Sequence, residues 1–168
     1  MGVASLSFSP DGQLLVAGRQ TGEAHMRAWR VSQKGLTELT LPFTRARRLA
    51  IAPDGKTLAF LDGYNGLHLM DLSSAMPMER AVLSGGDGPG SGRIQSFAFA
   101  PDGGRLASVN TRGHVVIWNV AEATKVQDCY LPRSLEAVAF AQDGRHLAVG
   151  SGDGMIYILR LGTQPLLR

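Results

Sequence analysis

Hydrophobic and polar residues alternate along this chain in short segments that are separated by turns containing glycine. Apolar side chains occupy every second position from Leu6 to Phe8 and from Phe97 to Phe99, and again at Leu49 to Ile51 and Val138 to Phe140. A period of two indicates β-strands. No amphipathic segment is long enough to predict a competing helix. The pattern therefore predicts an all-β fold.

One short phrase follows each of these strands: FSPDGQLLVA, IAPDGKTLAF, FAPDGGRLAS and FAQDGRHLAV. Its turn begins at Pro10, Pro53, Pro101 and Gln142, so the spacing is 43, 48 and 41 residues, as in propeller blades. Proline presets the backbone, aspartate bonds the local backbone, and glycine takes the positive φ of a tight hairpin. We predict that the aspartates form these turns: Asp11, Asp54, Asp102 and Asp143.

Three further strands are expected in each repeat. The second begins at Leu15, Leu58, Leu106 or Leu147, and the third includes HVVIWNV from His114 and MIYILRL from Met155. The run from Val115 to Trp118 is apolar on both faces, which indicates a sheet packed between two others, as in radially stacked blades. The fourth-strand candidates are Leu36 to Leu41, Glu79 to Leu83, Val126 to Leu131 and, unless the last blade is incomplete, Gln164 to Leu167.

The four repeated phrases and the VVIWNV segment resemble the WD-repeat β-propeller family over essentially the whole chain. The resemblance implies a propeller of four-stranded antiparallel blades, with about four blades present. Trp118 and Trp29 stand at the family's tryptophan position, and Ser108 and Asp153 match single members of its polar network. The second repeat, LAFLDGYNGLHLMDL, is also similar to propellers attached to periplasmic proteins and peptidases.

We expect one propeller region over residues 1–168, with repeats at 2–44, 45–92, 93–133 and 134–168. Propellers of this family most often have about seven blades. Three arrangements therefore stay open: a partial propeller from a longer protein, a head-to-tail homodimer of eight blades, and a closed four-blade ring. If the ring does not close on itself, the outer faces of the first and last blades expose apolar surface.

Composition and motifs predict no catalytic centre. The four histidines fall one in each repeat without ligand spacing, and neither a Gly-x-Ser-x-Gly motif nor paired carboxylates are evident. The glycine-rich segment Ser84 to Arg93 lacks the Gly-Lys-Ser/Thr ending of a phosphate loop and is predicted to be a connector. We expect a protein that is not an enzyme and binds no metal or cofactor.

The remaining composition indicates where the protein works. The single Cys129 cannot form an internal disulfide, and apolar runs are far shorter than the roughly 20 residues of a membrane span. The chain opens directly on strand sequence, without the features of a signal peptide. These features predict a cytoplasmic location and no membrane partner.

One rim of the predicted propeller is rich in arginine. The resemblance implies that the turns between second and third strands, together with the links between blades, form the face that binds partners. Arginine outnumbers lysine fourteen to three, and its planar fork suits carboxylates and phosphates. Tyr64 could add an aromatic anchor. We predict these partner-binding residues: Arg45, Arg47, Arg48, Arg93, Arg133 and Tyr64, with Arg19 and Arg112 on the same rim.

Three functions are open at this point. The first is a non-catalytic protein-interaction scaffold whose rim recognises acidic or phosphorylated segments. The second is an accessory propeller of a larger enzyme, such as a bacterial kinase or a peptidase. The third, nucleic-acid binding, is suggested by a pI near 9.4, but aromatic residues make up only 7% of the chain and are not interleaved with basic residues.

Overall fold

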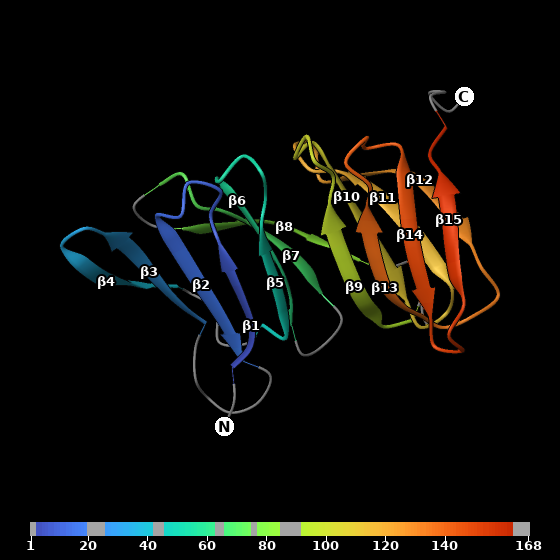
Figure 1. The fold of residues 1–168 in the computed structure, drawn as a ribbon, viewed down its shortest axis with the longest axis horizontal. Coiled ribbons are helices and arrows are strands. Elements are labelled where there is room, and N and C mark those ends of the chain that lie inside the picture. Colours follow the sequence, from blue (N-terminus) through green and yellow to red (C-terminus); the bar gives the residue numbers. More distant parts are fainter. Residues whose placement is uncertain are drawn as a thin grey trace. The chain divides into compact units, whose positions relative to one another are not determined.

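A computed structural model describes residues 3–19, 26–41, 46–62, 66–74, 77–84 and 92–162. The chain divides into two compact units, residues 1–89 (unit 1) and 90–168 (unit 2), and each contains two sheets (Figure 1). Every regular element in the described residues is a β-strand, which confirms the predicted all-β class. Within those residues, no helix is long and apolar enough to cross a membrane.

Unit 1 contains two four-stranded antiparallel sheets, which we call blades 1 and 2, and each follows chain order. Blade 1 consists of β1 (Val3–Phe8), β2 (Leu14–Arg19), β3 (Arg27–Ser32) and β4 (Gly35–Thr40). Blade 2 consists of β5 (Arg48–Ile51), β6 (Thr57–Leu61), β7 (Leu67–Asp71) and β8 (Met78–Leu83).

Unit 2 contains blades 3 and 4, built in the same antiparallel order. Blade 3 consists of β9 (Ile94–Phe99), β10 (Arg105–Asn110), β11 (His114–Asn119) and β12 (Thr124–Tyr130). Blade 4 consists of β13 (Leu135–Phe140), β14 (His146–Ser151) and β15 (Ile156–Arg160). The predicted fourth strand of this blade, Gln164 to Leu167, lies outside the described residues. The four sheets confirm the predicted blades.

The four repeated turns have the predicted chemistry. In each, the aspartate Oδ1 accepts a hydrogen bond from the backbone N–H two residues later, and the next glycine has a φ between 64° and 70°. Such local bonds hold the hairpin between the first two strands. The donor–acceptor pairs are Gln13–Asp11 (3.0 Å), Lys56–Asp54 (2.7 Å), Gly104–Asp102 (2.9 Å) and Arg145–Asp143 (2.8 Å).

Each unit has an apolar core between its two blades. In unit 1 the core brings Val16 and Ala28 of blade 1 together with Leu58 and Met70 of blade 2. In unit 2 the residues are Ala107, Val109, Val115 and Ile117 of blade 3 with Leu135, Val138, Leu147 and Val149 of blade 4. Full burial of one such large aliphatic side chain contributes about 1.5–3 kcal/mol. The blades of a unit are therefore held by side chains rather than by backbone bonds.

A buried polar pair joins two strands of blade 3. The indole Nε1–H of Trp118 donates to Ser108 Oγ at 2.9 Å, and the two residues are 7% and 2% exposed. A buried tryptophan N–H needs such a partner because desolvation without one is costly. The pair confirms that Trp118 and Ser108 occupy matching positions of the family's polar network.

Blades 1 and 4 each leave apolar side chains exposed. On blade 1, Leu6 and Phe8 are 61% and 58% exposed. On blade 4, Ile156 and Ile158 are 72% and 67% exposed. Each pair lies on one face of its strand, because residues two apart share a face. Contiguous apolar surface of this kind marks sites of association.

The Trp118–Ser108 bond yields a first prediction. Ser108→Ala should lower the free energy of unfolding of the chain by about 1–3 kcal/mol, because the buried indole N–H loses its acceptor. The measurement is chemical denaturation followed by circular dichroism. In a Trp118→Phe background the same serine change should cost little, since no N–H is left unpaired. An equal cost in both backgrounds would show that the bond does not carry the effect.

Asp143 predicts a dependence on acid. Its pKa is lowered to about 2, first by the Arg145 backbone N–H and then by the His146 side chain, whose Nδ1 is 2.6 Å from Asp143 Oδ2. A carboxyl with a lowered pKa stabilises the fold above its unfolded value near 3.8 and loses that contribution as the pH falls toward 2.

Carboxyl-carbon NMR titration of the folded chain should place the Asp143 midpoint about two units below that of the same residue in urea. Asp143→Asn should remove this part of the acid sensitivity. Coincident midpoints in folded and unfolded chains would refute the assignment.

The exposed apolar faces predict self-association. Light scattering after size exclusion should give a mass above the 17.9 kDa of one chain, rising with concentration, because association removes these faces from water. Replacing Leu6, Phe8, Ile156 and Ile158 by threonine should restore the monomer mass. Threonine at Leu36 and Val82, which are exposed at 64% and 53%, is the matched control. A native chain that stays monomeric at every concentration contradicts the prediction.

Candidate functional site

A buried asparagine holds the turn between β10 and β11. Asn110 is 1% exposed, and its Oδ1 accepts hydrogen bonds from the backbone N–H groups of Arg112 (3.0 Å) and His114 (2.9 Å). The Gly113 N–H donates to the Asn110 carbonyl oxygen at 3.2 Å. Because the buried amide satisfies the backbone around it, the turn has one defined conformation. The exposed Arg112 side chain is therefore attached to a well-defined backbone.

The segment that links blades 3 and 4 lies against this turn. The Leu131 N–H donates to the Gly113 carbonyl oxygen at 2.8 Å, and the Arg133 N–H donates to the Leu131 carbonyl oxygen at 2.7 Å. Gly113 has a φ of 89°, and a Cβ there would come within 1.7 Å of the Leu131 carbonyl oxygen. Only glycine allows this approach. It places Arg133 beside the turn that carries Arg112.

Arg133 is oriented by an ion pair. Its Nε donates to Asp153 Oδ2 at 2.8 Å, and its Nη1 donates to the Pro132 carbonyl oxygen at 3.0 Å. Hydrogen bonds from Ser151 Oγ, and secondarily from Arg133, hold the pKa of Asp153 below its usual value. Asp153 is therefore ionised at neutral pH. The pair limits the motion of the guanidinium while leaving it exposed to solvent.

Arg93 joins the same turn from the start of blade 3. Its N–H donates to Thr111 Oγ1 at 3.0 Å, and its carbonyl oxygen accepts from the Thr111 N–H at 3.0 Å. The Arg112 side chain lies over Gly92, where an added Cβ would be 2.8 Å from Arg112 Cγ. Three arginines, at 93, 112 and 133, are thus built around one turn of unit 2.

Arg112 and Arg133 line an open groove of about 500 Å³, which we call the rim groove, and Arg93 is bonded through its backbone to Thr111 of the same groove. Tyr130 is 63% exposed, and its ring meets that of His114 edge to face, with centroids 5.6 Å apart. Within residues 92–162, neither Arg93 nor Arg112 forms an ion pair. Exposed guanidinium groups beside an aromatic ring suit an anionic ligand with an apolar part. The groove is lined by Thr111, Arg112, His114, Tyr130, Pro132, Arg133 and Ser134.

The other predicted binding residues belong to unit 1. The Arg47 N–H donates to the Leu61 carbonyl oxygen at 2.9 Å, and the exposed Arg48 is the first residue of β5. Arg45 and Tyr64 lie outside the described residues. The structure therefore places Arg47 with Arg48 in one unit and Arg93 with Arg133 in the other. That Arg45 and Arg93 face one ligand stays a prediction.

The aromatic side of the rim groove was not predicted. Tyr130 ends β12 and pairs in register with His114 at the start of β11. Their contact therefore depends on the alignment of the third and fourth strands, and the weak fourth-strand pattern did not define that alignment. The observed register, not the spacing of motifs, supplies the aromatic side of the groove.

A histidine cluster in unit 1 was also not predicted. His68 Nε2 lies 3.1 Å from Asp62 Oδ2, its Nδ1 contacts Glu79 Oε1, and its ring stacks on Phe60 at 4.7 Å. The two carboxylates bond opposite nitrogens of one ring, so they do not converge on a metal position. In the described part of the chain, no group of three or more His, Cys, Asp or Glu residues could hold a metal ion. The cluster links β7 to β8.

Comparison with known proteins agrees with the architecture. The family model "WD domain, G-beta repeat" matches residues 1–29 and 132–159. The U3 small nucleolar RNA-associated protein 18 homolog of Arabidopsis thaliana is 22% identical over 98% of this chain and 30% of its own length. Human WD repeat and SOCS box-containing protein 1 is 32% identical over 57% of this chain and 22% of its own length.

A solved structure gives the same result for the fold. The β-propeller domain of Cps50 (Swd1) from Myceliophteria thermophila superposes with a TM-score of 0.76 at 16% identity, covering 99% of this chain and 55% of that chain. The chain spans less than a third of the length of the two curated relatives named above. With the four blades and the Trp118–Ser108 pair, these similarities support a WD-repeat β-propeller family for the chain.

Proposed function

We propose that this chain is a protein-interaction scaffold and that its rim groove binds an acidic or phosphorylated segment of a partner protein. Family membership supports the general role of a scaffold, since propellers of this kind bind other proteins. The observation that carries the specific role is the arrangement of Arg93, Arg112 and Arg133 around one hydrogen-bonded turn.

The geometry favours recognition of an anion. Arg93 and Arg112 offer guanidinium groups that make no ion pair within residues 92–162, while Asp153 partly neutralises only Arg133. A guanidinium can bind a carboxylate or a phosphate through two parallel hydrogen bonds. The exposed Tyr130 ring provides an apolar surface for a neighbouring side chain of the partner. Acidic segments with an adjacent apolar residue therefore fit best.

The arginines of unit 1 extend the proposal. Arg48 is exposed at the start of β5, at the corresponding end of blade 2. We propose Arg45, Arg47, Arg48 and Tyr64 as a separate set of candidate contacts for an acidic segment within unit 1.

Nucleic-acid binding is the competing assignment. It draws on the formal net charge of +3 and on the name of the Arabidopsis relative, which describes that protein as RNA-associated. The rim groove contains one exposed tyrosine rather than the series of aromatic residues on which successive bases stack. Binding to phosphopeptide is therefore the assignment we prefer, and nucleic acid enters the test as a competitor. The role of accessory propeller in a larger enzyme stays a prediction.

The test compares two variants of equal net charge. Arg93→Glu with Arg112→Glu should weaken binding of a fluorescent peptide, carrying phosphoserine between two glutamates, by about tenfold or more. Arg145→Glu with Arg160→Glu changes the charge equally at exposed residues outside the groove and should have a much smaller effect. Fluorescence anisotropy measures both, and affinity should fall as sodium chloride rises, because exposed charges are screened.

Two results would contradict the assignment. If the groove variant and its charge-matched control weaken binding equally, only the net charge of the chain matters. If duplex DNA or single-stranded RNA binds more tightly than the peptide and the groove variant abolishes that binding, the groove recognises nucleic acid.

A further inference from the structure

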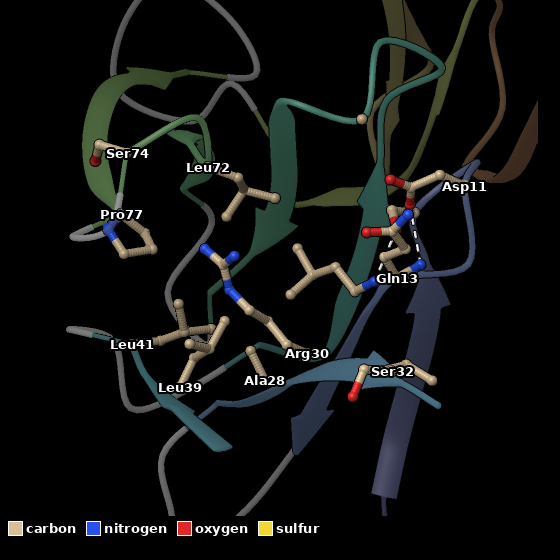
Figure 2. A pocket seen from close by; sticks show the side chains of 14 residues that line it. Asp11, Gln13, Ala28, Arg30, Ser32, Leu39, Leu41, Leu72, Ser74 and Pro77 are labelled. Atoms are coloured by element: carbon tan, nitrogen blue, oxygen red, sulfur yellow. Dashed lines mark hydrogen bonds between the residues drawn. The ribbon is translucent and has the colours of Figure 1, made fainter. Parts of the chain in front are cut away.

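A second opening lies between the two blades of unit 1, at the end of the sheets that carries the Asp-Gly turns. It has a volume of about 380 Å³ (Figure 2). This size falls in the range of roughly 300–1,000 Å³ typical of ligand sites. Its walls come from the β1–β2 turn and the start of β2, from β3 and β4, and from the turns of blade 2. We call it the interblade pocket. None of its lining residues belongs to the rim groove.

Arg30 on β3 extends into this pocket. Figure 2 shows its guanidinium pointing toward the space between Leu72, Leu41 and Pro77. Strand pairing explains the direction, because Arg30 pairs with Leu14 and shares a face of the sheet with Ala28. That face forms the core with blade 2, so the charged side chain lies at the edge of an apolar interface.

The equivalent residues in blades 2 and 3 have a different role. Asp71 and Asn119 occupy the same register position in their blades as Arg30 does in blade 1. The partners on the second strand are Leu14 for Arg30, Thr57 for Asp71 and Arg105 for Asn119. Asp71 Oδ1 accepts the Ser73 N–H at 2.7 Å, and Asn119 Oδ1 accepts the Ala121 N–H at 2.9 Å. Both side chains hold the turn that follows their strand. Arginine has no acceptor and cannot do this.

In blade 1 another residue holds that turn. Ser32 Oγ accepts the Lys34 N–H at 3.3 Å and donates to the Gly35 carbonyl oxygen at 3.1 Å. Arg30 itself makes no hydrogen bond or ion pair with its side chain within the described residues. Its side chain is therefore available to a ligand in the pocket.

The negative and positive side chains of the pocket, Asp11 and Arg30, lie on different sides of it. Asp11 lies on the opposite side from the apolar wall that surrounds Arg30 (Figure 2), and its Oδ1 already accepts bonds from Ser9 Oγ (2.5 Å) and the Gln13 N–H (3.0 Å). A second carboxylate is repelled at that side and attracted at the Arg30 side. Leu39, Leu41 and Leu72 provide the aliphatic surface next to the guanidinium.

We propose that the interblade pocket binds an extended peptide segment in which a glutamate or aspartate stands beside a leucine, isoleucine or valine. The carboxylate pairs with Arg30, and the aliphatic side chain packs on Leu39, Leu41 and Leu72. A peptide is favoured over a free carboxylic acid because β4, beside the pocket, is the edge strand of blade 1. An edge strand offers backbone groups to which an extended segment can hydrogen-bond. This proposal does not depend on the rim groove.

The test uses an array of pentapeptides with a central glutamate flanked by leucine, isoleucine or valine, and the same peptides with glutamine instead. The best glutamate peptide should bind the chain about tenfold or more tightly than its glutamine counterpart, because the charge-assisted bond to Arg30 is lost. Calorimetry gives the affinities, and the NMR signal of Arg30 Nε–H should shift on binding.

Arg30→Asn should remove the difference between the two peptides. This variant should fold, because blade 3 has asparagine in the same register. Arg160→Asn, the same change at the corresponding position of blade 4, is the control that should keep the difference.

Any of three results would overturn the proposal. The first is equal binding of the glutamate and glutamine peptides to the native chain. The second is a glutamate preference that survives in Arg30→Asn. The third is an Arg30 Nε–H signal that octanoate shifts and no peptide does, which would show a site for free carboxylic acids.

Discussion

The structure depends on one constraint: a sheet that is apolar on both faces must pack against another sheet on each side. In blade 2 all five residues of β6 are buried, and in blade 3 five of the six residues of β10 are buried. In contrast, β1 of blade 1 and β15 of blade 4 contain only exposed and half-buried residues. First strands of the repeat also differ: β9 of blade 3 is buried or half-buried along its length, whereas β1 of blade 1 is not. Strands at the same place in the repeat therefore differ in burial according to what packs on their blade.

Because side-chain packing holds the blades of each unit, the ends of the sheets can vary. At one end the Asp-Gly turns repeat almost unchanged, since each aspartate satisfies the backbone of its own hairpin. At the other end the turns and links differ, and in unit 2 they gather arginines around Asn110. The sequence repeat accounts for the first end but says little about the second. Fold is shared across such proteins, whereas binding is determined by residues at particular sites.

The sequence predicted the architecture well for a physical reason. Turn chemistry is local, so the four hairpins could be located from Pro-Asp-Gly and Gln-Asp-Gly alone, and the fourth strands were placed within two residues of β4, β8 and β12. The candidate site was less predictable, because it depends on register. Tyr130 reaches His114 only through the pairing of β11 with β12, and Arg133 approaches Arg112 only because Gly113 admits the Leu131 carbonyl oxygen. Each of these contacts joins two segments of the chain, so neither can be read from one segment alone.

The most specific features arise where the repeats differ from one another. Asp71 and Asn119 stabilise the turn after the third strand in blades 2 and 3, whereas Ser32 takes that role in blade 1, where the register position is Arg30. Once the turn is held by another residue, the position is free to carry a side chain of opposite charge. The aliphatic part of such an arginine can pack on the core, but its exposed guanidinium makes no apolar contact. A residue that does not stabilise its local structure, at a position where other repeats have one that does, is a candidate for a functional role. Arg30 is such a residue.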